Sequence, residues 1–466
     1  MLKKVFTQFV VALLVLLWLS AAQAETTNAP AHVSAALEKS RQIGRIVEKI
    51  RCLFFTNEFQ TKVQSPEDFR AYVKKAIAKQ FGEEGTDGYV RGLTKIGVLK
   101  HPVDLISTIL AILEGQAAAY YDPECDTYFL LATNVPAFVF DAISSHELCH
   151  ALQDQHFNLH AFLEEDVEAA CDNGDSSLAK QCLVEGEATL VMMIWMSMQQ
   201  MDTDNPALAE PIASMGVNCQ AAMDFDSVLA LAETGMSAAN EGWGNLGEVM
   251  KELENYPRYF VEVIFSSYMQ GALMVDYVKS RGGWKAVSEL YKNPPESTEQ
   301  ILHPEKLSGK RDVPVDIRFP GLLKQLSEGW RMVEEDVLGE LGIRIFLEIW
   351  QAEGAKDPSA AASAAAGWGG DRYYYFANAE TGKDLLVWKT VWDSPEEAAE
   401  FAIAYRVALV SRFPALKKVW RSDSASSFSY QVWEVEPGRF LKLMRENEIV
   451  GIIDTTDRAK ADVLWK

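Results

Sequence analysis

Helical spacing of apolar residues runs through much of the first 300 residues. Between residues 32 and about 109, apolar side chains recur every three or four positions, which places them along one face of a helix. The same spacing begins near Pro136, extends from about Ser177 to Gln200, and returns from Tyr259 to Leu290. Ser297-Thr298-Glu299-Gln300 has the form of a capping box, so we expect a short helix to begin there.

Strand patterns are fewer and lie in two places. Residues 116–121 and 127–131 are short apolar, aromatic runs on either side of a turn-forming Pro/Asp segment, and they predict a β-hairpin. Beyond residue 311, strands are predicted around 373–376, 385–388 and 429–433, with an amphipathic helix from Ser394 to Leu409. Together the patterns indicate an α+β fold.

The same patterns divide the chain into two expected domains. We expect a mainly helical domain with a small sheet over residues 25–310 and a smaller α+β domain over residues 311–466. Within the first domain, residues 201–253 are acidic, alanine-rich and interrupted by prolines and glycines. We interpret that segment as an insertion or lid.

The N-terminus has the pattern of a cleaved secretory signal. Lys3 and Lys4 precede an unbroken apolar run over residues 9–19, and Ala22-Gln23-Ala24 follows, so cleavage is expected after Ala24. An uncleaved anchor is the alternative, but the run is shorter than the roughly 20 residues that span a bilayer. Residues 1–24 therefore indicate a secreted or periplasmic protein, and no later segment is apolar enough to span a membrane.

Charge and cysteines narrow the expected partners and bonds. The chain has 66 acidic and 44 basic residues, which give a formal net charge of −22, and its basic residues form no dense cluster. Such a surface repels phosphate backbones, so nucleic-acid binding is disfavoured. The six cysteines are compatible with disulfides in an exported chain. Cys171 and Cys182, which bracket a short polar loop, are the pair expected to bond, and free buried thiols are the alternative.

Candidate chemistry is concentrated in His146-Glu147-Leu148-Cys149-His150. Residues four apart lie on one face of a helix, so His146 and His150 can hold the same metal ion. Glu147 lies about 100° round the helix from His146, close enough to take a proton from a metal-activated water but not to act as a ligand. The motif therefore predicts a zinc site with a general base. A surface helix that happens to carry two histidines is the alternative.

A catalytic zinc site of this kind needs a third protein ligand and one open position. The next predicted helix contains Glu185-Gly186-Glu187-Ala188, where two acids interrupt an apolar sequence. A buried carboxylate is costly unless it is paired, and a metal would pair it. Glu185 and Glu187 lie about 200° apart on a helix, so only one can face the ion. Gly186 and Ala188 would let this helix approach the histidine helix closely.

A His-Glu-x-x-His helix followed by a helix with Glu-Gly-x-Ala resembles the gluzincins, the clan of thermolysin and the zinc aminopeptidases. The resemblance covers residues 116–304, and the sequence after the motif also resembles exported bacterial members of that clan. It implies a zincin-like fold in which His146, His150 and Glu185 hold Zn²⁺ and Glu147 is the general base, with Glu187 as the alternative third ligand. The hairpin would supply the edge strand that pairs with an extended substrate. An ordinary structural hairpin is the alternative.

Two features depart from these families. The Gly-x-Met-Glu-Asn of the exopeptidases does not precede the histidine motif, so an endopeptidase is expected rather than an aminopeptidase. The aspartate that thermolysin carries four residues after its ligand glutamate is Thr189 here, so another group must orient a histidine. Asp154, one turn beyond His150, is a candidate, and a solvated helix-end acid is the alternative.

Peptide hydrolysis also needs a hydrogen-bond donor for the oxyanion. Tyr268-Met269-Gln270-Gly271-Ala272 resembles the Tyr-x-x-Gly-Ala of the aminopeptidases, in which the tyrosine hydroxyl is that donor. Tyr268 is therefore a candidate catalytic residue, and an ordinary core aromatic residue is the alternative. His303 is the second candidate, or simply a residue that ends a short helix.

Taken together, the motifs predict an exported zinc metallopeptidase that hydrolyses peptide or protein substrates. The alternatives are a zincin fold that binds a partner without catalysis and an envelope-assembly protein with a structural zinc. Glu147 argues against a pure binder, which would not need a general base. A structural zinc usually has four protein ligands, and Cys149 is the only extra donor near the motif.

Overall fold

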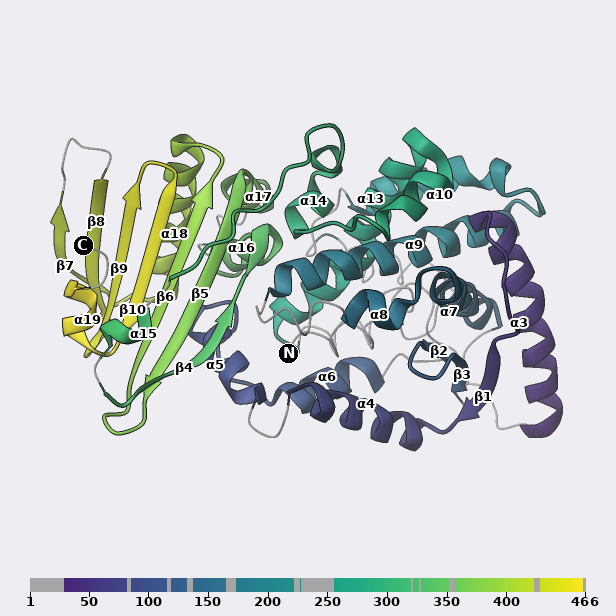
Figure 1. The fold of residues 1–466 in the computed structure, drawn as a ribbon, viewed down its shortest axis with the longest axis horizontal. Helices are drawn as coiled ribbons and strands as arrows, with labels where there is room; N and C mark the ends of the chain where they lie inside the picture. The colour runs from purple at the N-terminus through teal and green to yellow at the C-terminus, as the bar shows by residue number, and fades with distance from the viewer. Residues whose placement is uncertain are drawn as a thin grey trace.

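Helices occupy one end of the molecule and a large sheet the other (Figure 1). The structure is a computed structural model, and it describes residues 29–81, 85–114, 119–131, 137–164, 173–221, 227, 255–319, 322–326, 328–351, 357–422 and 428–463. The predicted signal, Cys171 and most of the predicted insertion lie outside these residues. The described part combines helices with two sheets, which confirms the α+β class at this level.

The helical end is built from the elements that the apolar spacing predicts. The histidine motif lies on α7, the acidic pair on α9 and the Tyr-x-x-Gly-Ala sequence on α13, each close to the predicted bounds. Ser297 accepts a hydrogen bond from the Gln300 N–H at 3.3 Å, so it caps α14 as predicted. The elements are α3 (Ala29–Arg51), α4 (Pro66–Phe81), α5 (Gly85–Ile96), α6 (Leu105–Glu114), α7 (Ala137–Phe157), α8 (Leu159–Glu164), α9 (Gly174–Gln200), α10 (Pro206–Ala221), α13 (Arg258–Leu290), α14 (Thr298–Leu302) and the 3₁₀ helix η3 (Pro304–Leu307).

A three-stranded sheet lies against this helical end. Strands β2 (Ala119–Asp122) and β3 (Thr127–Leu131) form the predicted antiparallel hairpin, and β1 (Gln60–Gln64) pairs with β3 in parallel, in the order β1-β3-β2. β1 corrects the prediction of uninterrupted helical structure between residues 32 and 109. Its sequence, Gln-Thr-Lys-Val-Gln, has little apolar pattern, and it becomes a strand by pairing with β3, far along the chain.

The C-terminal sheet has seven antiparallel strands in the order β4-β5-β6-β10-β9-β8-β7. Leu386 and Trp388 of β6 contribute to the core beneath α16 and α18, whereas Leu385 and Val387 belong to a smaller cluster on the opposite face with α15. The elements are α15 (Leu322–Gln325), β4 (Trp330–Asp336), α16 (Gly339–Ile349), α17 (Pro358–Ala365), β5 (Trp368–Asn378), β6 (Lys383–Trp392), α18 (Pro395–Arg412), β7 (Lys417–Ser422), β8 (Phe428–Glu436), β9 (Arg439–Glu446), β10 (Ile449–Thr455) and α19 (Arg458–Val463).

The two expected domains share an apolar core. Val90 of α5 and Phe260 of α13 belong to the same cluster of buried side chains as Phe346 of α16 and Trp388 of β6. Burial of these aromatic and aliphatic surfaces favours a fixed arrangement of the two ends.

A buried polar junction also joins α9 to the C-terminal end. Asp175, in the first turn of α9, accepts hydrogen bonds from Thr298 N at 3.2 Å and Thr298 Oγ1 at 2.5 Å. Gly339 packs against the same carboxylate: its φ is +75°, and a β-carbon there would lie 1.8 Å from Asp175 Oδ1. The backbone of Gly339 also donates to Asp371, whose carboxylate accepts four hydrogen bonds from the described residues. Only glycine fits at position 339.

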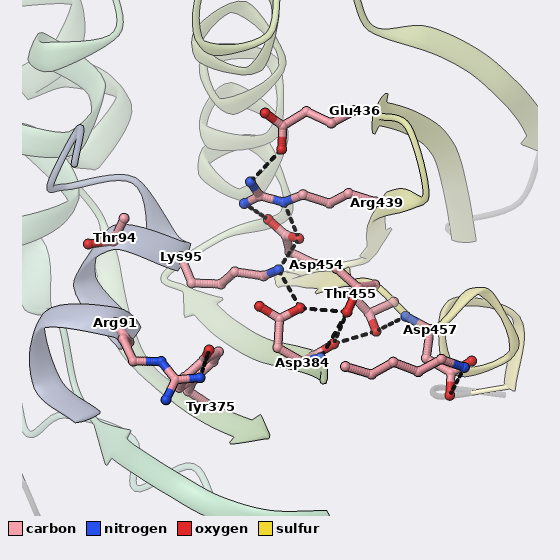
Figure 2. A network of polar contacts seen from close by, with 12 residues as sticks. Arg91, Thr94, Lys95, Tyr375, Asp384, Glu436, Arg439, Asp454, Thr455 and Asp457 are labelled. Atoms are coloured by element: carbon pink, nitrogen blue, oxygen red, sulfur yellow. Dashed lines mark hydrogen bonds and ion pairs between the residues drawn. The ribbon is translucent and has the colours of Figure 1, made fainter. Parts of the chain in front are cut away.

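A second junction is ionic and connects α5 to the sheet (Figure 2). Lys95 Nζ lies 2.8 Å from Asp384 Oδ1 and 3.1 Å from Asp454 Oδ1. Arg439 forms a two-point contact with Asp454, at 2.9 and 2.7 Å. Burial alone would raise the pKa of Asp454, but Lys95 and Arg439 lower it below its usual range.

Asp454→Asn should therefore destabilise the protein by about 3 kcal/mol at pH 6, because it leaves Lys95 and Arg439 without their shared buried partner. A depressed folded pKa gives stability that is complete above the unfolded pKa of about 3.9 and is lost as the pH falls below it. The deficit of the variant should consequently shrink below about pH 4. Urea unfolding of wild type, Asp454→Asn and the exposed control Glu446→Gln at pH 6 and pH 3.5 measures this, and a pH-independent deficit contradicts it.

Candidate metal centre

The histidine motif lies in the middle of a helix that is buried on nearly all sides. Residues 142–154 of α7 are all buried, and α3, α9 and β2 pack around it. His146 and Glu147 are each 1% exposed and His150 is 4% exposed. The alternative of a surface helix that happens to carry two histidines is therefore wrong.

Helices α9 and α13 cross at two glycines. A β-carbon on Gly186 would lie 2.1 Å from the carbonyl carbon of Gly271, and one on Gly271 would lie 2.2 Å from the carbonyl oxygen of Cys182. The expectation that Gly186 faces the histidine helix is thus corrected: its missing side chain makes room for α13 instead. This contact brings the Glu-Gly-x-Ala and Tyr-x-x-Gly-Ala segments together.

The two histidines and Glu185 converge on one point. The Nε2 atoms of His146 and His150 lie 3.1 Å apart, and Glu185 Oε2 lies 3.4 Å from each. Glu185 is 1% exposed. Among the residues that the structure describes, these three side chains form a buried group able to hold a metal ion.

Burial and mutual contact control the charges of this group. Burial lowers the pKa of His146 to about 4. Burial also opposes protonation of His150, but Glu185 outweighs it and raises that pKa to about 9. The histidines in turn lower the pKa of Glu185 against the effect of burial. The contact between Glu185 and His150 thus favours the charged form of both groups.

Glu147 reaches the small sheet with one of its two carboxylate oxygens. Its Oε2 accepts a hydrogen bond from the backbone N–H of Tyr121, on edge strand β2, at 2.9 Å. Its Oε1 is buried and has no hydrogen-bond partner within the described part of the chain. Burial raises the pKa of this carboxyl group to about 8. A buried oxygen of this kind is suited to accepting a proton.

Glu187, the alternative third ligand, has a different partner. Arg51 of α3 reaches it from the other side of α9, with Arg51 Nε 2.5 Å from Glu187 Oε1, and both side chains are almost fully buried. Arg51 also donates to Ser288 Oγ at 3.0 Å and lies over the ring of Trp284. The two acids of Glu-Gly-Glu therefore face opposite ways, as the helical spacing predicts, and Glu185 is the one beside the histidines.

Gln153, rather than the predicted Asp154, contacts the far side of His150. His150 Nδ1 lies 2.7 Å from Gln153 Oε1. Asp154 instead accepts hydrogen bonds from the Tyr121 hydroxyl at 2.8 Å and from the Leu159 N–H at 2.7 Å. It is buried rather than solvated, and it connects the hairpin to the start of α8.

The structure separates the two oxyanion candidates. Tyr268 is fully buried on α13, and its ring centroid lies 5.7 Å from that of His146. His303 instead pairs with Glu340 of α16, its Nε2 lying 2.9 Å from Glu340 Oε1. Tyr268 is therefore the candidate that contacts the metal-ligand group.

A second cluster of acids lies outside this site. Glu299, Asp312 and Asp393 come close enough together to suggest a metal group. Lys306 Nζ lies between them, at 2.6, 2.9 and 3.1 Å from their carboxylates. The lysine supplies the compensating positive charge, and the cluster is explained without an ion.

The described cysteines form no disulfide. Cys149 and Cys182 are free and buried, and Cys52, Cys125 and Cys219 are free and exposed. Cys171 lies outside the described residues, so the structure lends no support to the predicted bond between Cys171 and Cys182. A bridge between Cys149 and Cys182 is absent.

Comparison with known proteins finds a match only for the C-terminal end. A family model described as a domain of unknown function (DUF8575) matches residues 325–462. This segment covers the seven-stranded sheet and leaves out the histidine motif. No curated protein and no solved structure matches the chain. No described helix is both long enough and apolar enough to cross a membrane.

Proposed function

We propose that the protein is an exported zinc metallopeptidase with a zincin-like site, in which His146, His150 and Glu185 are the ligands. The observation that carries the proposal is the triangle of their nearest atoms, with edges of 3.1, 3.4 and 3.4 Å. Tetrahedral zinc with bonds of roughly 2.0–2.1 Å separates its ligand atoms by about 3.3 Å. Two imidazoles and a carboxylate also match the donor set of catalytic zinc.

Zinc, Glu147 and strand β2 would each have a separate role in hydrolysis. When bound, zinc would polarise the substrate carbonyl and make a neighbouring water more acidic. Glu147 would accept the proton of the attacking water through its unbonded Oε1, since Oε2 is held by Tyr121 N–H. Edge strand β2, whose backbone reaches Glu147, would align an extended peptide beside the base.

A structural zinc in a binding or envelope-assembly protein is the second candidate. The near-complete burial of His146, Glu147 and Glu185 favours it, because a peptide reaches these atoms only after surrounding elements move. Against it stands the number of ligands: the described residues supply three rather than the usual four. The buried base beside them would also have no purpose.

Metal analysis together with peptide digestion tests the proposal. The purified mature protein should contain one equivalent of zinc, and it should cleave internal bonds in a mixed peptide library. A chelator should stop the cleavage, and added zinc should restore it. Stoichiometric zinc without cleavage by the mature protein or by trimmed versions would favour the structural role, and no zinc at all would contradict both.

Tyr268→Phe should slow hydrolysis while leaving zinc bound. The ring next to His146 is kept and only the hydroxyl is lost, so kcat should fall by the equivalent of about 2–4 kcal/mol with little change in KM. Steady-state kinetics with a peptide found in the library screen measures this. An unchanged kcat would make Tyr268 a core residue.

A further inference from the structure

Each hydrogen-bonding group of Gln153 has a buried partner. Its Oε1 lies 2.7 Å from His150 Nδ1, and its Nε2 lies 3.0 Å from the carbonyl oxygen of Val184 and 2.8 Å from the hydroxyl of Tyr291. Gln153 is 1% exposed. An amide with one acceptor and two donor hydrogens is fully satisfied by these three contacts.

These contacts determine which ring nitrogen of His150 carries a proton. The carbonyl of Val184 can only accept, so the amide nitrogen of Gln153 must face it and the amide oxygen must face His150. His150 Nδ1 must then be the donor. With Nδ1 engaged as a donor, Nε2 is the nitrogen available to a metal, and it faces the group formed with His146 and Glu185. Metal-binding histidines need this arrangement.

The chain of contacts continues to the buried ion pair. The Tyr291 hydroxyl accepts from Gln153 and donates to Glu187 Oε2 at 3.0 Å, and Glu187 also accepts from Arg51. The ring of Tyr291 stacks on Phe157 with centroids 4.0 Å apart. Every donor from His150 to Tyr291 therefore points toward Glu187, whose charge Arg51 balances.

We infer that Gln153 is the positioning residue of the metal site, and that Tyr291 and the Arg51–Glu187 pair hold its amide in place. The inference rests on the proposed zinc ligands, and it identifies the side chain that orients one of them, His150. It also assigns a role to the second acid of Glu-Gly-Glu. A neutral amide takes the place that a carboxylate commonly fills beside such a histidine.

Zinc affinity and histidine spectroscopy test the inference without an assay of activity. Gln153→Leu should weaken zinc binding about 10–100-fold in chelator competition. Tyr291→Phe, which removes one hydrogen bond, should weaken it about 2–10-fold. In ¹⁵N spectra of the zinc-loaded wild type, the His150 Nδ1 proton should exchange slowly with solvent, and this protection should fall in both variants.

Gln155→Leu is the matched control. It removes the same amide from the same helix, but Gln155 binds the backbone of Thr56 and Asn57 instead of His150. Its zinc affinity should equal that of the wild type, and an equal loss would overturn the inference. If Gln153→Leu does not fold, Tyr291→Phe decides the question.

The outcomes separate this inference from the proposed function. A wild type that binds zinc, with a Gln153→Leu or Tyr291→Phe variant of unchanged affinity and proton protection, overturns the inference alone. A wild type without zinc binding overturns the metal site and the inference together. Weaker zinc binding in the variants supports the inference even when the protein cleaves no peptide.

Discussion

Glu147→Gln should keep the fold and the zinc and lose most of the hydrolysis. Glutamine has the size of glutamate, and its amide oxygen can still accept the 2.9 Å hydrogen bond from Tyr121 N–H. What disappears is the proton acceptor at the buried Oε1. Loss of a general base costs about 10²–10⁴-fold in rate, so kcat should fall by at least about 10²-fold.

The measurement pairs single-turnover cleavage with metal analysis of the same preparation. Equal zinc content in wild type and Glu147→Gln makes the rate comparison a test of the base alone. Equal rates in the two proteins would contradict the proposed mechanism. Should neither protein cleave any peptide, even when trimmed, the structural-zinc candidate takes its place.

Helix periodicity made the centre of the site predictable. His146 and His150 had to share a face, and Glu185 and Glu187 had to point in opposite directions, whatever surrounded them. The choice between the two acids depended on Arg51, which pairs with Glu187 and leaves Glu185 to face the histidines. Arg51 and Glu187 are 136 residues apart in the sequence. No local pattern reveals such a partner.

The orienting residue was missed for a similar reason. Gln153 and Asp154 lie three and four residues after His150, so both fall on its face of the helix. Charge favoured Asp154 in the sequence, but the hydroxyl of Tyr121 and the amide of Leu159 occupy that carboxylate. Gln153 is selected by the carbonyl of Val184, on another helix, which only the packing of α7 against α9 brings near.

Packing between helices was predicted only in part. Gly186 was expected to admit the histidine helix, yet it meets Gly271 of α13. A signal was present, because Gly271-Ala272 is a second pair of small residues on a long helix. Close crossings need small residues on both helices, and Gly271 supplies the one on α13 that meets Gly186. β1, by contrast, depends on its long-range pairing with β3 and has no signal of its own.

Glu185→Ala should abolish stoichiometric zinc binding. The variant removes one of three ligands, so the loss of affinity should exceed the roughly 10–100-fold that follows from losing a hydrogen-bond partner of a ligand. It leaves Arg51 and Glu187 paired, so the fold should survive. Zinc content after dialysis and chelator competition measure the effect.

The control substitution at Glu187 must leave Arg51 with a hydrogen-bond acceptor, because the two residues form a buried ion pair. Glu187→Ala would leave Arg51 buried without a counter-charge, at a cost of about 3–5 kcal/mol, and lost zinc could then reflect unfolding. Glu187→Gln keeps an acceptor for Tyr291 and Arg51, so it should be less stable but still bind zinc. Zinc retained by Glu185→Ala and lost by a folded Glu187→Gln would transfer the ligand to Glu187. That result would break the correspondence with Glu-Gly-x-Ala, because the residue before the glycine would no longer be the one that holds the metal.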